Sequence, residues 1–229
     1  QCAAHLEQCM DKVKKTPDHW EHYAVSLALD NRLPEAIKQY QNIIKHHPGY
    51  DTIWFNYGYA LADGRVAKYK KAILCFDAAE QKGNHSANLY LYRGGCYYNL
   101  KKHVQAAADL EKALEVEPTL ADAAYMLGEI NRSYGDWKSA VEYHSRALYY
   151  NPSHPSALMY RLIARLQLKD KNGFIINREA AQQDVDKMLE EDRRGGKPFF
   201  MSLTSKEGKP LKIVTATVSE KGDLNYAVE

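Results

Sequence analysis

Apolar positions recur along residues 17–154 with a period of about 34 residues. The clearest markers are four alanines that lie 36, 34 and 34 residues apart, namely Ala36, Ala72, Ala106 and Ala140. Trp20 to Trp54 and Pro118 to Pro152 each span 34 residues as well. Three residue types with one spacing indicate an internal repeat, lengthened by two residues in its second copy.

Within each period, the apolar residues follow helical spacing and predict two helices joined by a turn. The first helix of the first period has bulky, bulky, small and bulky side chains at Trp20, Tyr23, Ala24 and Leu27. Later periods have glycine at the places where two helices should approach most closely, at Gly58, Gly94 and Gly128. Proline follows the second helix and ends it. No single period can bury its apolar face alone, so we expect the units to stack.

This pattern resembles the tetratricopeptide repeat, a helix–turn–helix unit of about 34 residues. The resemblance covers residues 17–154 and implies an all-α fold, a right-handed superhelix of stacked helix pairs. It implies four units, at 17–50, 51–86, 87–120 and 121–154. The fourth unit departs from the family pattern at Ala124, Asn131 and His144, so its packing is expected to be less typical.

Both ends of the chain predict further elements. Residues 1–16 have helical spacing and are expected to form a helix of an incomplete repeat. Residues 155–196 predict a fifth, lengthened or capping helix pair, with Asn177 as the N-cap of its second helix. Residues 197–229 are rich in β-branched residues and predict a three-stranded antiparallel meander. So small a sheet is marginal alone, so it should dock on the end of the solenoid or pair with another chain.

The resemblance also implies a concave surface lined by the first helix of each unit. By the repeat geometry, ten residues offset from the packing positions should face this surface and bind a partner: Glu21, Val25, Phe55, Tyr59, Leu91, Tyr98, Tyr125, Glu129, Arg132 and Met159. The set is aromatic and apolar with a few polar groups, which is typical of binding patches. The alternative is that some of these residues belong to the core, because register alone errs by a residue.

One well-known use of the family is a clamp of Lys, Asn and Arg side chains that fixes the C-terminal carboxylate of chaperone tails. The corresponding places in this chain hold Glu21 and Val25 in the first unit, and Asn88 and Tyr92 in the third. Only Asn56 matches the clamp. Binding of heat-shock chaperone tails is therefore not expected.

Composition narrows the classes of partner. A net charge of +2 and a pI near 8.2 are too mild to indicate nucleic-acid binding. No apolar run approaches the ~20 residues that cross a bilayer. The four cysteines are spread through a chain that can bury its own core, so free thiols are expected. The 17 tyrosines exceed the needs of a core and favour a tyrosine-rich surface.

Few residue patterns in the sequence suggest a catalytic or metal-binding site. His19 with His22, and Cys2 with His5 and Cys9, lack the ligand spacing of a structural zinc site, so no metal or cofactor is expected. The acidic stretch DVDKMLEED is typical of a solvated helix face. The sequence has no phosphate-binding loop and no serine-nucleophile motif. We therefore expect a protein that is not an enzyme.

Two functions stay open, and the compartment is unknown. The first is an adaptor or scaffold that holds a protein or peptide in the concave surface. The second is a structural protein that self-associates as a homo-oligomer through the solenoid end or the terminal strands. An enzyme whose catalytic domain begins at the terminal sheet has no motif in its favour.

Free cysteines and the family's use inside cells favour the cytoplasm, whereas a signal peptide removed before Gln1 would indicate a periplasmic or secreted protein.

Overall fold

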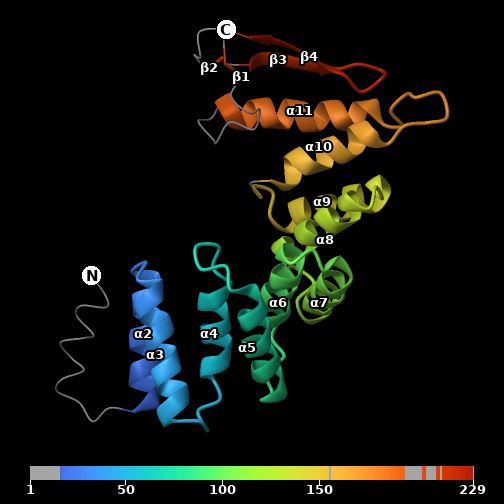
Figure 1. The fold of residues 1–229 in the computed structure, drawn as a ribbon. Helices are drawn as coiled ribbons and strands as arrows, with labels where there is room; N and C mark the ends of the chain where they lie inside the picture. The colour runs from blue at the N-terminus through green and yellow to red at the C-terminus, as the bar shows by residue number, and fades with distance from the viewer. Residues whose placement is uncertain (1–15, 155, 194–202, 205–209, 212, 229) are drawn as a thin grey trace. The chain divides into compact units, whose positions relative to one another are not determined.

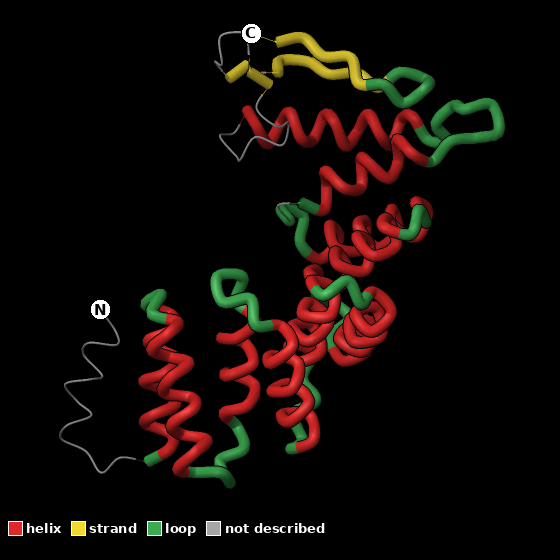
Figure 2. Tube along the Cα trace, viewed as in Figure 1, coloured by secondary structure: helices red, strands yellow, loops and turns green. Residues whose placement is uncertain are grey.

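The computed structural model describes residues 16–154, 156–193, 203–204, 210–211 and 213–228. These residues form ten helices and four short strands (Figure 1, Figure 2). The chain divides into two compact units, which we call unit 1 (residues 1–118) and unit 2 (residues 119–229). The helix predicted over residues 1–16 falls, except for Thr16, outside the described residues.

Unit 1 consists of antiparallel helix pairs. They are α2 (Pro17–Leu29) with α3 (Leu33–His46), α4 (Ile53–Ala62) with α5 (Tyr69–Gln81), and α6 (Ala87–Asn99) with α7 (His103–Val116). Neighbouring pairs also pack on each other, through α3 with α4 and α5 with α6. The start of α6 is fixed by Ser86, whose hydroxyl accepts the Leu89 N–H. The all-α repeat packing expected from the 34-residue period is therefore present.

The helical part of unit 2 begins with another helix pair and ends with a longer helix. It contains α8 (Ala121–Ser133) paired with α9 (Trp137–Tyr150), then α10 (Ala157–Gln167), which packs against both α9 and α11 (Arg178–Arg193). Asn177 caps α11 as predicted, since its Oδ1 accepts the Ala180 N–H at 2.9 Å. The apolar face of α11 is buried, at Ala181, Val185, Met188 and Leu189.

The repeated glycines lie where the helices of a pair touch. A Cβ added at Gly58 would come within 3.0 Å of the Phe76 ring. At Gly94 the nearest atom would be a carbon of Leu110, also at 3.0 Å. At Gly128 it would lie 2.6 Å from the ring of His144, a buried residue of α9. The prediction that only a small residue fits at these crossings is confirmed.

The C-terminal strands differ from the single three-stranded meander predicted. β1 (Leu203–Thr204) pairs antiparallel with β2 (Pro210–Leu211), and β3 (Ile213–Val218) pairs antiparallel with β4 (Leu224–Val228), as separate two-stranded sheets. Pro210 has no N–H to donate, which limits the ladder of β2. Pro210 pairs with Thr204 on one side, but without an N–H β2 is a poor central strand, so a continuous sheet through β2 is disfavoured.

The β3–β4 hairpin docks on α11 through backbone groups of β3. The Gln182 side chain donates from Nε2 to the Ala216 carbonyl at 3.0 Å and accepts the Val218 N–H at 2.8 Å. Arg178 donates to the Val218 carbonyl at 2.7 Å. The side chains of Ala216 and Val218 are buried. The expectation that the sheet docks on the helical array therefore holds in this form.

A buried arginine ties three helices of unit 1 together. Arg93 on α6 donates two hydrogen bonds to Asp109 on α7, both at 2.8 Å. It also donates to Asp77 and Glu80 on α5, at 2.7 and 2.5 Å. Only 7% of the side-chain surface of Arg93 and of Asp109 is exposed. Arg93 and Asp109 therefore form a buried charge pair, and Arg93 links both α5 and α7 to α6.

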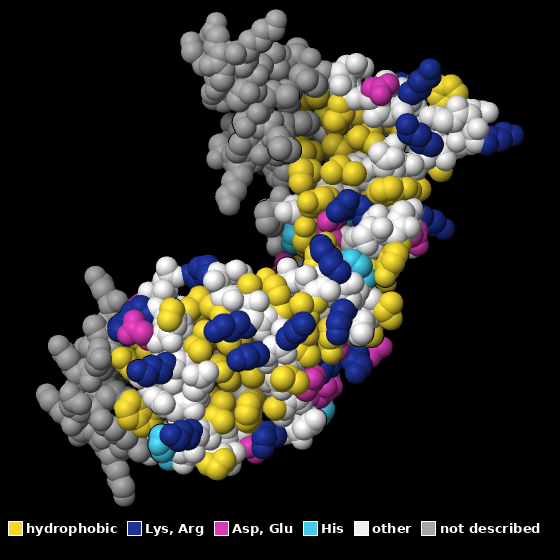
Figure 3. Space-filling model, in the orientation of Figure 1, with side chains coloured by type: hydrophobic (Ala, Val, Ile, Leu, Met, Phe, Trp, Pro, Cys, Tyr) yellow, Lys and Arg dark blue, Asp and Glu magenta, His cyan; other side chains and the backbone are white. Residues whose placement is uncertain are grey.

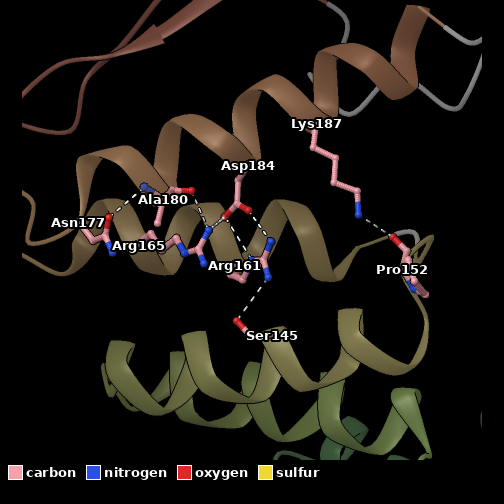
Figure 4. Close-up of polar contacts among 8 residues, drawn as sticks. All are labelled: Ser145, Pro152, Arg161, Arg165, Asn177, Ala180, Asp184 and Lys187. Atoms are coloured by element: carbon pink, nitrogen blue, oxygen red, sulfur yellow. Dashed lines mark hydrogen bonds and ion pairs between the residues drawn. The ribbon is translucent and has the colours of Figure 1, made fainter.

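In unit 2 a buried carboxylate has the corresponding role (Figure 4). Asp184 on α11 accepts hydrogen bonds from Arg161 and Arg165 on α10, at 2.5 and 2.6 Å for the shortest contacts. Arg161 also donates to Ser145 on α9 at 3.4 Å, and Arg165 to the Ala180 carbonyl at 2.7 Å. The cluster therefore connects α9, α10 and α11.

Candidate protein-binding surface

Three aromatic side chains on α4 and α6 form what we call the aromatic face of unit 1. Tyr59 and Tyr92 meet edge to face with ring centroids 4.7 Å apart, and Phe55 lies 6.1 Å from Tyr92. Phe55 rests on the buried Phe76 at 5.9 Å. Tyr59 is 48% exposed. An exposed tyrosine held by packed neighbours offers contact area at a small entropic cost on binding.

A pocket of about 270 Å³ opens beside Phe55. Its other lining residues come from the start of α4 and the end of α5, and they include Asp51, Thr52, Lys82 and Asn84. Lys82 Nζ lies 2.5 Å from Asp51 Oδ1 across its rim. The pocket therefore combines one aromatic wall with a polar mouth, which suits a single side chain of a bound segment.

Glu21, the first predicted site residue, is buried and satisfied within the chain. Its carboxylate accepts from the hydroxyls of Tyr50 and Thr52 at 2.5 and 3.1 Å, and from Asn56 Nδ2 at 2.7 Å. Glu21 therefore orients α2 against α4. The same carboxylate accepts the hydrogen bond of Asn56, the one residue that matched the chaperone-tail clamp.

The other predicted residues of unit 1 differ in exposure. Val25 is half-buried, whereas Leu91 is buried in the core. Tyr98 is half-buried, and Lys101 Nζ lies 5.8 Å from the centre of its ring. Tyr92 lies in the aromatic face although the sequence analysis did not assign it there. The repeat register on α6 was ambiguous by one residue, and the position after Leu91 is the one that faces Tyr59.

In unit 2, the predicted residues meet in a cluster between α8 and α10. Tyr125 is half-buried and lies 4.6 Å from the ring of His154 and 6.0 Å from that of Tyr160. Arg132 covers the Tyr160 ring at 5.0 Å and donates two hydrogen bonds of 2.9 Å to the buried Glu129. These groups largely satisfy one another.

Two further side chains complete that region. Met159 is half-buried on α10. His144 is fully buried and replaces the apolar residue that Phe76 and Leu110 provide in earlier repeats. Its Nε2 approaches Glu129 Oε1 at 3.4 Å, but neither ring nitrogen makes a well-formed hydrogen bond with the described residues. The less typical packing expected of the fourth unit is found here.

The two cysteine thiols that the structure describes are poorly placed to act as nucleophiles. Cys75 and Cys96 are free and buried, and burial raises the pKa of each thiol to about 12. These two thiols therefore stay protonated and poorly nucleophilic. Among the described residues, no three His, Cys, Asp or Glu side chains are grouped so that they could hold a metal ion. Cys2, His5 and Cys9 lie outside those residues.

Comparison with known proteins identifies the repeat. A family model described as "Tetratricopeptide repeat" matches residues 64–119, which hold α5, α6 and α7. Residues 64–119 therefore match a tetratricopeptide repeat, and the helices of the chain pack pairwise as such repeats do. Proteins of this family mediate protein–protein interactions, and their fold is a scaffold that is typically non-enzymatic. No helix that the structure describes is long and apolar enough to cross a membrane.

Two curated proteins match about half of the chain. The Hsp70-Hsp90 organizing protein of Triticum aestivum is 24% identical over 124 residues, which are 54% of this chain and 21% of that protein. Tetratricopeptide repeat protein 16 of Homo sapiens is 26% identical over 132 residues, which are 55% of this chain and 14% of that protein. The chain thus spans about a fifth or less of the length of these relatives.

Solved structures show the same fold at low identity. A MamA protein structure gives a TM-score of 0.65 at 19% identity, covering 82% of this chain and 98% of that one. PilW, a type IV pilus biogenesis factor, gives 0.67 at 18% identity, covering 83% and 84%. YrrB, a tetratricopeptide-repeat protein with an unusual peptide-binding site, gives 0.62 at 20% identity, covering 82% and 92%. At these identities, the likeness concerns the fold alone.

Proposed function

We propose that this protein is a non-enzymatic scaffold that binds a peptide segment of a protein partner on the surface lined by the first helices of its repeats. The observation that carries the proposal is the aromatic face of unit 1, where Tyr59 stands 48% exposed against Tyr92. Peptide grooves between helices take their affinity from a few such anchors. YrrB, which shares the fold, has a peptide-binding site.

The ten predicted residues have different roles in this proposal. Phe55, Tyr59 and Tyr98 contact the partner in unit 1, with Val25 beside them. The corresponding contacts in unit 2 are Tyr125, Arg132 and Met159. Glu21, Leu91 and Glu129 are buried, so they hold the contacting helices in place. The pocket beside Phe55 receives one side chain of the partner, and an apolar residue flanked by a polar group fits it best.

The experiment is a peptide-display selection on the full chain, followed by binding measurements on single selected peptides. Tyr59→Ala should weaken a selected peptide by roughly 30-fold, because truncating an anchor costs about 2 kcal/mol. Tyr149→Ala is the matched control, since Tyr149 on α9 is 79% exposed and also forms an edge-to-face pair, with Tyr150. Equal losses in both variants, or selected peptides indifferent to Tyr59→Ala, would contradict the proposal.

The second candidate is self-association through the terminal strands. Within the described residues, the backbone groups of β3 that point away from β4 already bond to Gln182 and Arg178, which reduces the edge available to a second copy. Light scattering on the full chain and on a truncation near Gly196 tests this candidate. A concentration-dependent dimer that disappears on truncation would favour it, and a monomer in both cases would remove it.

A further inference from the structure

Two turns of unit 1 concentrate positive charge. Residues 62–74 and 99–105 together hold six lysines and arginines and one aspartate, a net charge of +5. The whole chain carries +2, so all its other residues together carry −3. Asp63 is taken by Arg65, which donates to it twice at 2.8 Å. Five exposed lysines remain without an ion pair among the described residues: Lys68, Lys70, Lys71, Lys101 and Lys102.

The fold brings these turns to one rim of unit 1. Both turns connect the first helix of a pair to the second, so α5 and α7 begin at the same end of the stack. Arg93 holds Asp77 on α5 and Asp109 on α7, which fixes the two helices at the same level. The lysines of the two turns therefore lie at the same end of the helix pairs of unit 1. We call this surface the lysine rim.

Exposed aliphatic side chains accompany the lysines. Leu74 is 67% exposed and lies three and four residues after Lys71 and Lys70, on the same side of α5. Val104 is 75% exposed and lies in the first turn of α7, three residues after Lys101 along the chain. Figure 3 shows Lys and Arg side chains interspersed with hydrophobic ones on the visible face of unit 1, with few acidic side chains among them. Lysines interleaved with aliphatic groups are typical of surfaces that rest on anionic membranes.

The residue types disfavour other polyanions. Nucleic-acid sites rely on the guanidinium fork of arginine and on exposed aromatic rings that stack with bases. Arg65 is held by Asp63, and Tyr69 of this rim is half-buried. Lysine is a point charge on an aliphatic stem, and it can lie along a lipid headgroup layer while its ammonium group stays in water.

We propose that the lysine rim docks unit 1 on an anionic membrane surface, with Leu74 and Val104 entering the headgroup boundary. The lysines bind lipid phosphates, and no part of the chain needs to cross the bilayer. This inference rests on other observations than the peptide-binding proposal, because the aromatic face lies on α4 and α6, whereas the rim lies on the turns and on α5 and α7 and meets the proposed partner contacts only where Lys101 covers Tyr98. Together, the two surfaces would present a partner at a membrane.

The first test is co-sedimentation of the full chain with vesicles of phosphatidylcholine, with or without phosphatidylglycerol. Binding should require phosphatidylglycerol and weaken as salt is raised. The double variant Lys70→Gln, Lys71→Gln should lower the partition coefficient roughly 30-fold, since each lysine near an anionic surface is worth about a fivefold change. The matched control is Lys38→Gln, Lys45→Gln, which removes two exposed lysines from α3 of the same unit and should change binding less than about threefold.

A second pair of variants separates a membrane from any other polyanion. Leu74→Ser with Val104→Ser keeps every charge and should lower vesicle binding at least about fivefold while leaving binding to heparin or single-stranded DNA unchanged. Circular dichroism must show the same helix content in all variants. Equal binding to neutral vesicles, equal losses in the α3 control, or vesicle binding indifferent to Leu74 and Val104 would each overturn the proposal.

Discussion

Units 1 and 2 are each tied together by an arginine–carboxylate cluster, and the two clusters have opposite composition. In unit 1 one arginine, Arg93, serves three carboxylates. In unit 2 one carboxylate, Asp184, serves two arginines. Arg93 and Asp109 are equally buried, and Asp77 and Glu80 lie nearer to solvent. In unit 2 Asp184 is more deeply buried than both of its arginines. A buried charge is tolerated when it is surrounded by opposite charge, whichever sign lies inside.

The largest effect is expected where both members of a pair are buried. Arg93→Met would leave Asp109 charged and enclosed, so the free energy of unfolding of unit 1 should fall by about 3–5 kcal/mol. Urea unfolding followed by circular dichroism measures this loss. Arg65→Met is the matched control, because Arg65 is exposed and loss of its pair with Asp63 should lower the free energy of unfolding far less. Similar losses of unfolding free energy in the two variants would show that burial of the ion pair does not determine the loss.

Asp184→Asn should cost unit 2 somewhat less, about 2–4 kcal/mol. The stranded groups would be Arg161 and Arg165, which are 17% and 18% exposed and can turn toward water. The thermal melting temperature of the full chain measures the effect. Glu179→Gln on the first turn of the same helix is exposed and serves as the control, with a cost under about 1 kcal/mol. A loss larger than that of Arg93→Met would reverse the expected order.

The third prediction concerns a close helix crossing in each unit. Gly128→Ala places a Cβ 2.6–2.9 Å from three ring atoms of His144, which has no room to move, and should cost about 1–3 kcal/mol. Gly94→Ala meets the more flexible Leu110 side chain at 3.0 Å and should cost less. Melting temperatures of both variants compare the crossings. A Gly128→Ala protein as stable as the parent would mean that the His144 ring shifts freely.

The smallest effect is a difference in acid sensitivity. Burial is the largest single influence on the pKa of Glu80 and would raise it, but the hydrogen bond and charge of Arg93, with smaller contributions from Tyr90 and Lys112, together hold that pKa below the ordinary value of 4.5. The ionised carboxylate therefore adds stability that is complete above about pH 4.5 and is lost as the pH falls through the lower folded value. Melting temperatures between pH 7 and pH 3 should fall more steeply for the parent protein than for Arg93→Met. Parallel curves would contradict this.

The helix pairs could be predicted because their spacing is imposed by packing. Gly58 must face Phe76 and Gly94 must face Leu110, so the period of 34 residues is visible in the sequence itself. The N-cap at Asn177 was predicted for a similar reason, since its contact lies within three residues along the chain. Local rules of this kind need no knowledge of the rest of the fold.

The candidate surface could be predicted only in part. Spacing fixes where a helix lies but not its rotation to within one residue, which is why Leu91 is buried while Tyr92 faces Tyr59. The two charge clusters were not predicted at all. Arg93 bonds to Asp109 sixteen residues away, and Arg161 bonds to Asp184 twenty-three residues away. A sequence does not distinguish a charged residue that will be buried from one that will be exposed to water. Which residues bind a partner stays a prediction.

The contact between Gln182 and β3 has a consequence for the order in which unit 2 can fold during synthesis. Gln182 offers that strand one donor and one acceptor, as an adjacent strand would. A ribosome completes α11 about 20 residues before it reaches β3. Through that interval, the amide of Gln182 and its apolar neighbours face water, so the outer layer of unit 2 is the last to close, and its exposure to other nascent chains ends only when the hairpin arrives.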